Sequence, residues 1–433
     1  MSASDSKSSF FKQSGWMVIA TLVCGVLMLG VHMLVNRLMT KAEYEELFSL
    51  LKIVTFIGMP AGGLTTVFAH QAAAAINDES RRRLQTCARS VGFAIVAIWL
   101  GMLAIAAIGQ DWIMRNQQLS STPAYWMATV IALSTLMIPL ARGLLQGNRR
   151  FGPMGWSFLC DGVIRFGGAL AVLLFIVKSA TGVMTAVLFG QIVSLFVAGW
   201  WARDFFRRSE AAVDWRVWTQ RAVPLMLGSG VIVFFMTADA MLARSLFPDI
   251  KDIFSLYVPG NMVGFAMAQF AVPIAAVMFP RVVHGAATAS KTEAFRWTFI
   301  LTAIVGVAAA LIATFAPALP VTVMYKDEYA DGAALVPWFA WSMLVFTLAN
   351  VLVTNLMARS DFRAIKWLVS IALLYGLALA FSKERLQAME PLAAYRNVVL
   401  LLGFFNVALF ATAAAFTRFR DRRDEGTKPQ PSP

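Results

Sequence analysis

The sequence has little charge. Only 14% of its 433 residues are Asp, Glu, Lys or Arg, whereas 59% are hydrophobic, and the mean hydropathy is +0.67. Such a chain has too little polar surface to coat a water-soluble globule. The composition therefore excludes a soluble fold and indicates an integral membrane protein.

Reactive and metal-binding residues are scarce as well. The three cysteines, Cys24, Cys87 and Cys160, are widely spaced and form neither a metal-ligand cluster nor a disulfide framework. The three histidines are isolated, and no Asp-x-Asp pair occurs. A membrane glycosyltransferase or polymerase would also need a sizeable external loop, and the loops expected outside are short. We therefore expect no cofactor and no enzymatic activity, and a transferase or polymerase is the least favoured function.

Long apolar windows are what the chain does contain. Windows of about 17 to 27 residues predict an all-α protein with twelve transmembrane helices, the first of them an uncleaved span rather than a signal peptide. The first six spans are expected at 16–35, 47–69, 91–108, 124–145, 153–177 and 182–201. The second six are expected at 223–246, 253–279, 297–315, 335–357, 365–381 and 398–416.

The positive charges follow the expected topology. With both termini in the cytoplasm, most of the 37 Lys and Arg residues fall in segments on the inner side. This asymmetry accounts for the net charge of +13 without a nucleic-acid partner. The longest polar interruption, residues 202–221, is then a cytoplasmic connector between an N-terminal lobe (1–201) and a C-terminal lobe (222–417). Residues 418–433 read as a disordered basic tail.

Two short internal repeats support these two lobes. Glu46–Leu50 (ELFSL) is matched by Asp252–Leu256 (DIFSL), and Leu144–Phe151 (LLQGNRRF) by Asn355–Phe362 (NLMARSDF), in the same order and at nearly the same offset. Because six helices return the chain to the cytoplasm, the repeats are parallel and related by an axis along the membrane normal. Two six-helix lobes around a central cavity are typical of a transporter.

Some of these segments also resemble a known family. Met324–Leu335 (MYKDEYADGAAL), Ala42–Glu45 (AEYE) and Leu145–Phe151 (LQGNRRF) are similar to motifs of polysaccharide biosynthesis transporters. These are the lipid-linked oligosaccharide flippases of the multidrug/oligosaccharidyl-lipid/polysaccharide (MOP) superfamily. The sequence departs from the motif at Lys326, where glycine is common.

The resemblance implies a function and a location. An undecaprenyl-diphosphate-linked oligosaccharide would pass from the inner to the outer leaflet of the bacterial cytoplasmic (inner) membrane by alternating access, for cell-surface or exopolysaccharide assembly. The expected partners are this glycan, membrane lipids and polysaccharide assembly proteins, with coupling to a proton or sodium gradient left open. The alternative is a cation-coupled multidrug exporter of the same superfamily. Such exporters commonly carry an acidic residue in the first span, and residues 16–35 contain none.

An anionic headgroup needs fixed cations and polar groups along its path. Asp161 and Arg165 lie four residues apart on one face of the fifth span, with Arg165 near the midplane. We expect Arg165 to bind phosphate and Asp161 to hold or compete for its guanidinium; the alternative is a pair that only neutralises itself. Four uncharged residues are expected to bond either sugar hydroxyls or neighbouring helices: Gln191, Asn261, Gln269 and Asn350.

The second lobe has its own intramembrane charges. Asp239, a carboxylate within the seventh span, is a candidate ion-coupling site. Arg244 either snorkels to the outer interface or forms a ring of cations with Arg37 at the outer mouth. Arg142 and Lys52 are expected to be snorkelling interface residues.

Helix-breaking residues occur at corresponding places in the two lobes. They either act as hinges of a rocking motion or improve packing. These residues are Pro60, Gly62 and Gly63 in the second span, and Pro259, Gly260 and Pro273 in the eighth.

Overall fold

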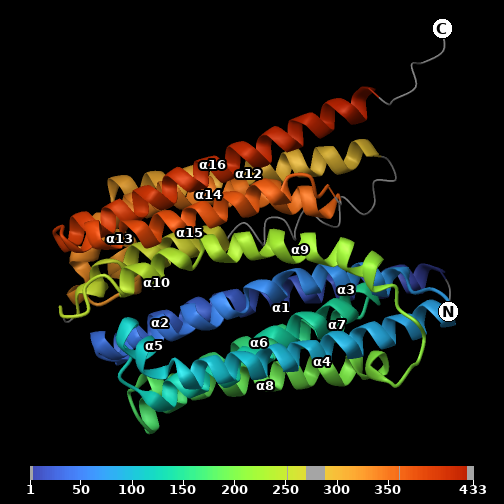
Figure 1. The fold of residues 1–433 in the computed structure, drawn as a ribbon, viewed down its shortest axis with the longest axis horizontal. Coiled ribbons are helices and arrows are strands. Elements are labelled where there is room, and N and C mark those ends of the chain that lie inside the picture. Colours follow the sequence, from blue (N-terminus) through green and yellow to red (C-terminus); the bar gives the residue numbers. More distant parts are fainter. Residues whose placement is uncertain (1–2, 251, 270–287, 360, 427–433) are drawn as a thin grey trace. The chain divides into compact units, whose positions relative to one another are not determined.

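The computed structural model describes residues 3–250, 252–269, 288–359 and 361–426, and in these residues it contains helices and connecting segments but no strand (Figure 1). A helix pairs its own backbone N–H and C=O groups, which is the condition for crossing hydrocarbon without a closed barrel. The predicted all-α fold is confirmed.

The elements up to the expected connector are mostly long helices. They are α1 (Ala3–Leu38), α2 (Lys41–Ile57), η1 (Met59–Ala61), α3 (Gly62–Ala74), α4 (Asp78–Ile108), α5 (Gln110–Asn116), α6 (Thr122–Gly147), α7 (Phe151–Phe175), α8 (Ala180–Ala202) and η2 (Arg203–Phe206). The remaining elements are α9 (Trp215–Phe235), α10 (Ala238–Arg244), η3 (Ile253–Leu256), α12 (Thr288–Phe315), α13 (Ala318–Met324), η4 (Asp327–Leu335), α14 (Val336–Ala358), α15 (Ile365–Gln387) and α16 (Pro391–Gly426). Residues 258–269 are also helical.

Most of the expected spans have a counterpart. Among the described residues, ten helices are long and apolar enough to cross a membrane, and α2 with α3 forms a further pair bent by 44°. The expected span 253–279 lies partly outside the described residues. α16 continues to Gly426, so the chain is helical through residues 418–426, where the sequence suggested a disordered tail.

Polar capping residues set where the helices begin. The side chains of Thr40, Ser121, Ser179 and Asp214 each accept a hydrogen bond from a backbone N–H in the first turn of α2, α6, α8 and α9. Asn77 forms a reciprocal capping box at the start of α4. Each cap satisfies a backbone N–H that has no partner within its helix.

The chain packs into two compact units, each made of separate segments. Unit 1 comprises Met1–Pro259 and Ala318–Ala333, and unit 2 comprises Gly260–Pro317 and Ala334–Pro433. Unit 1 therefore runs through the expected connector at 202–221, and its first segment ends within the expected hinge at Pro259 and Gly260. The division into two six-helix lobes around a central cavity stays a prediction.

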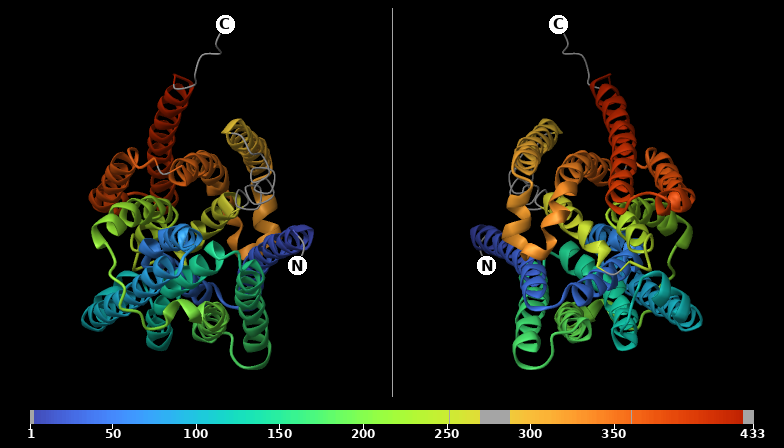
Figure 2. Two further views of the ribbon diagram at one scale, coloured as in Figure 1. Left: turned by 90° about the vertical axis from the view of Figure 1, so that its right-hand side faces the viewer. Right: turned by 90° about the vertical axis from the view of Figure 1, so that its left-hand side faces the viewer.

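Glycines let the helices of unit 1 approach closely. α7 packs against α1 and α8, as the views along the helices show (Figure 2). A Cβ at Gly162 of α7 would lie 3.0 Å from the Cα of Cys24 in α1, and one at Gly190 of α8 would lie 3.1 Å from the carbonyl oxygen of Asp161. Small residues at helix contacts are the usual means of close packing between membrane helices.

Unit 2 is held by similar contacts. α14 packs against α12 and α16. The Asn406 amide of α16 donates to the carbonyl oxygen and the hydroxyl of Ser342 in α14, both at 3.0 Å. This polar contact links two apolar helices inside the unit.

Candidate functional site

Asp161 and Arg165 form an ion pair in the middle of α7. Arg165 Nε donates to Asp161 Oδ1 at 2.9 Å, and Arg165 Nη2 donates to Oδ2 at 3.5 Å. The side chain of Asp161 is 10% exposed and that of Arg165 is 15% exposed. The geometry is the one that the spacing of four residues predicts. The role of the pair in binding stays a prediction.

Arg142 of α6 is a second cation in this region. Its Nε donates to the Ser157 hydroxyl at 3.1 Å, and its Nη2 donates to the Ser194 hydroxyl at 2.9 Å. Its guanidinium lies 3.7 Å from the ring centroid of Phe158. The sequence suggested a side chain that snorkels to the inner interface; instead, Arg142 joins α6 to α7 and α8. No sequence pattern indicates that these serines face Arg142, because they lie 15 and 52 positions away on other helices.

Gln191 adds a polar contact between α8 and α6. Its Oε1 accepts hydrogen bonds from the Ser134 hydroxyl at 2.6 Å and the Thr135 hydroxyl at 3.1 Å. This is the interhelical bonding that the sequence left open as an alternative. Between residues 122 and 202, which include α6, α7 and α8, Asp161 is the only acidic residue. The two intramembrane arginines, Arg142 and Arg165, therefore give these helices a positive balance.

Arg244 is buried against the start of α2. It forms an ion pair with Glu45, and the two residues are 5% and 2% exposed, respectively. Arg244 Nε donates to the carbonyl oxygen of Gln117 and Nη2 to that of Gln118, each at 3.1 Å. The expected snorkelling conformation is not observed. A ligand would have to displace one of these protein acceptors to reach the guanidinium.

The start of α2 also holds several connecting segments of unit 1. Glu46 accepts hydrogen bonds from the Ser120 hydroxyl and from the Ser121 N–H, the latter at 2.8 Å. Glu43 accepts one from the Ala180 N–H at 2.6 Å. The acidic residues of this turn therefore fix the segments that precede α6 and α8.

A tyrosine contact joins α2 to the segment 318–333. The hydroxyls of Tyr44 and Tyr325 are 3.2 Å apart, and burial holds the pKa of Tyr325 well above its usual range, so this hydroxyl stays neutral. Lys326, the departure from the resembled motif, donates from its backbone N–H to Asn36 and from Nζ to the carbonyl oxygen of Met39 at 3.2 Å. This lysine thus has a structural role at the turn between α1 and α2.

Arg37 and Arg244 lie in different surroundings. Arg37 lies in the last turn of α1, is exposed, and donates to the carbonyl oxygen of Val323 at 2.9 Å. Arg244, in contrast, is buried in its ion pair. The two arginines therefore differ in exposure and in partners, and a ring of cations at an outer mouth stays a prediction.

Lys52 and Asp239 form a second buried group of charges. Lys52 Nζ donates to the carbonyl oxygen of Met236 at 3.2 Å and interacts electrostatically with Asp239, which is 1% exposed and accepts a hydrogen bond from the Tyr257 hydroxyl. His32 of α1 is within electrostatic range of both Lys52 and Arg165. The sequence placed Lys52 at the interface, whereas the structure places it inside unit 1.

The remaining predicted binding residues lie in unit 2. Asn261 is buried, Gln269 is exposed, and Asn350 is half-buried and accepts a hydrogen bond from the Thr354 hydroxyl at 3.3 Å. Within the residues that the structure describes, no three His, Cys, Asp or Glu side chains are grouped so that they could hold a metal ion.

The predicted hinge residues of the second span lie at a real break. Pro60 lies in the 3-10 turn η1 between α2 and α3, and Gly62 and Gly63 begin α3. A Cβ at Gly63 would lie 2.6 Å from the carbonyl oxygen of Leu225 in α9. Gly63 is therefore also a packing residue. Pro273 lies outside the described residues, and hinge motion at any of these positions stays a prediction.

Comparison with known proteins places the fold. No protein-family model matches the chain, and no curated protein sequence matches it. Among solved structures, the chain is similar to a MOP superfamily transporter from Pyrococcus furiosus (TM-score 0.63, 13% identity, 96% of this chain and 95% of that one). It is also similar to the eukaryotic MATE transporter AtDTX14 (TM-score 0.65, 12% identity, 94% and 96%).

A third similar structure is a flippase. The inward closed conformation of the lipid II flippase MurJ matches with a TM-score of 0.66 and 11% identity, over 92% of this chain and 87% of that one. The chain thus has the fold of these MOP superfamily transporters, which confirms the expected fold. Its long apolar helices indicate a multi-pass membrane protein.

Proposed function

We propose that this chain, which has the fold of MOP superfamily transporters, is a flippase for an isoprenoid-diphosphate-linked oligosaccharide. It would move the lipid-linked glycan from the inner to the outer leaflet of the bacterial cytoplasmic membrane by alternating access. Both termini would lie in the cytoplasm, as the distribution of Lys and Arg favours. The glycan would feed the assembly of a cell-surface polysaccharide.

The positive balance of α6, α7 and α8 carries this proposal. Arg165 and Arg142 lie inside these helices with one carboxylate, Asp161, between residues 122 and 202. A diphosphate headgroup is anionic and is recognised best by arginine, whose planar fork donates two parallel hydrogen bonds. The ion pair positions Arg165 before the ligand arrives, and the ligand phosphate would then compete with Asp161 for the same donors.

The alternative function is a cation-coupled multidrug exporter, for which the buried Asp239 would be the coupling site. This carboxylate is 1% exposed, accepts a hydrogen bond from Tyr257 and interacts electrostatically with Lys52. It would bind and release a proton or cation during transport. An exporter and a gradient-coupled flippase both have a use for such a site. The substrate therefore decides between the two functions.

The deciding experiment is a lipid analysis of the host strain with this gene deleted. For the flippase, we expect an undecaprenyl-diphosphate oligosaccharide to accumulate on the cytoplasmic leaflet. A normal lipid profile together with greater sensitivity to cationic drugs would instead support the exporter and overturn the flippase.

Arg165→Ala tests the proposed binding residue in the same strain. We expect at least a tenfold loss of transport at normal membrane levels, because the variant loses charge-assisted hydrogen bonds to the phosphate. The matched control is Arg115→Ala, which removes an exposed arginine from α5 and should leave transport unchanged. Full transport by Arg165→Ala would rule out its role in substrate binding.

A further inference from the structure

A pocket lies where the connection between α6 and α7 meets the end of α8. Its volume is about 740 Å³, and its lining includes three arginines, three tryptophans and one aspartate. It lies wholly within unit 1, since its lining residues fall between Arg149 and Asp204. It is separate from the intramembrane charges described above, because it lies at the ends of the helices that carry them.

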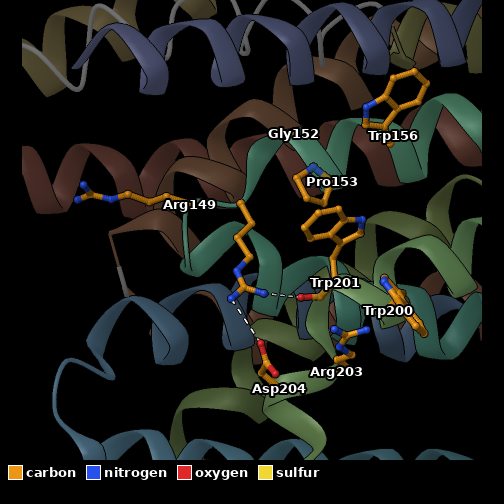
Figure 3. A pocket seen from close by; sticks show the side chains of 9 residues that line it. Arg149, Gly152, Pro153, Trp156, Trp200, Trp201, Arg203 and Asp204 are labelled. Atoms are coloured by element: carbon orange, nitrogen blue, oxygen red, sulfur yellow. Dashed lines mark hydrogen bonds and ion pairs between the residues drawn. The ribbon is translucent and has the colours of Figure 1, made fainter. Parts of the chain in front are cut away.

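The pocket keeps a positive balance despite its aspartate. Arg150 donates to the carbonyl oxygen of Trp201, and its Nη2 lies 3.7 Å from Asp204 Oδ2 (Figure 3). Asp204 is closer to Arg207, at 3.2 Å, so its charge is shared with an arginine outside the pocket. Arg203 adds a further cation to the lining.

The tryptophans give the pocket an interfacial character. Trp156, Trp200 and Trp201 are between 52% and 55% exposed. Arg203 lies over the ring of Trp200, with its guanidinium carbon 4.2 Å from the ring centroid. Exposed tryptophans at the ends of spans lie at the level of lipid headgroups, where their rings contact lipid and their N–H groups contact water. A ligand of this pocket therefore has a polar end and an apolar body.

We infer that this pocket binds the phosphate group of an anionic lipid in the leaflet on the basic side of the protein. Arg150 and Arg203 would contact the phosphate, whereas the side chain of Arg149 extends away from Arg203 in Figure 3. The tryptophan rings would contact the upper acyl or isoprenyl chain. A soluble anion would use the arginines but gain nothing from the rings, so the combination favours a lipid.

Two lipids share this chemistry, and binding measurements distinguish them. The full chain, purified in detergent, would be mixed with dioleoyl phosphatidylglycerol, dioleoyl phosphatidylcholine or undecaprenyl diphosphate, and the retained lipid measured by native mass spectrometry. We expect the anionic probe that the pocket favours to bind at least tenfold more tightly than phosphatidylcholine. Tighter binding of phosphatidylglycerol would show that the pocket binds a bulk membrane lipid. Tighter binding of undecaprenyl diphosphate would show that it binds an isoprenoid carrier.

Arg203→Gln is the test variant, because this exposed side chain packs on one ring of the pocket rather than supporting the core. We expect this variant to bind the preferred anionic lipid about tenfold more weakly, because it loses one charge-assisted hydrogen bond to the phosphate. Arg208→Gln removes an equal charge from the exposed connector and should bind the lipid as the unchanged chain does. Circular dichroism and thermal unfolding would verify that both variants fold.

Either of two results would overturn the inference. One is equal retention of all three lipids by the unchanged chain. The other is an equal reduction in binding of the anionic lipid by Arg203→Gln and Arg208→Gln. That result would show that the general surface charge, and not the pocket, attracts the lipid. Neither result depends on whether the protein transports a glycan, because lipid binding is measured without transport.

Discussion

Arg244 shows how little the position of a charged residue in a sequence says about its exposure. Counting along the seventh span placed it near the outer interface, where a long side chain can reach water. In the structure its guanidinium lies over the ring of Phe254 and pairs with Glu45, nearly two hundred positions earlier in the chain. Burying a charge requires such a partner, and a single sequence does not show which distant residue supplies it.

This burial predicts a large effect on stability. Arg244→Gln should lower the free energy of unfolding by about 3–5 kcal/mol, because it leaves the Glu45 carboxylate buried without its cation. Glu45→Gln should lower the free energy of unfolding by a similar amount. The double variant should lower it by less than the sum of the two single variants. Thermal unfolding of the purified variants in detergent measures each effect.

The exposed pair of Arg83 and Glu79 on α4 is the control. These side chains are 59% and 71% exposed, and the two residues lie four positions apart on one helix. Arg83→Gln should therefore change stability by less than about 1 kcal/mol. Equal losses for Arg83→Gln and Arg244→Gln would mean that the Arg244 ion pair contributes no more than a surface pair.

At the scale of the elements, apolar windows predicted most helices but not their true ends. α2 begins at Lys41, before the window expected at 47–69, and α4 begins at Asp78, well before 91–108. Depths counted from the window ends are therefore unreliable, which is why Lys52 was expected at an interface. The break at Pro60 was predictable, since proline removes a backbone donor and glycine adds freedom.

The close approach of α3 and α9 predicts a second effect. Gly63→Ala should destabilise the protein by about 1–3 kcal/mol, because the new methyl group would clash with the backbone at Leu225 rather than with a flexible side chain. Gly101→Ala on α4 is the matched control, since nothing lies within 4 Å of its added Cβ. It should be neutral or slightly stabilising, as alanine favours a helix.

Melting temperatures of the two glycine variants provide the comparison. A Gly63→Ala protein as stable as Gly101→Ala would show that the helices separate at no cost, which would favour a mobile hinge over tight packing at this position.

At the scale of the whole molecule, Asp239 is the residue that would link transport to an energy source. If it binds a proton or cation in each cycle, Asp239→Asn should abolish the dependence of transport on an imposed gradient while downhill exchange continues. Proteoliposomes with and without a pH or sodium gradient provide the measurement. Asp111→Asn, at an exposed position on α5, should behave as the unchanged chain does. Unaltered gradient dependence in Asp239→Asn would remove this residue from coupling.

The all-helical fold was predictable from the long apolar windows, because they depend on composition over many residues. The likeness to MOP superfamily transporters was predictable from short motifs such as Met324–Leu335. The grouping of Arg142 with Ser157 and Ser194 was not, because it depends on the rotation of three helices about their own axes. Nor did the sequence indicate that residues 318–333 belong with Met1–Pro259 in one compact unit.

The discontinuity of unit 1 bears on how the protein is made. Tyr44 meets Tyr325, and Asn36 meets Lys326, so these contacts wait until nearly three hundred further residues have left the ribosome. During that interval the turn between α1 and α2 has none of these partners, although its helices have been synthesised. Insertion into the membrane and completion of this unit are thus separate events during biogenesis, and a nascent chain halted before residue 318 would hold the first helices in an unfinished state.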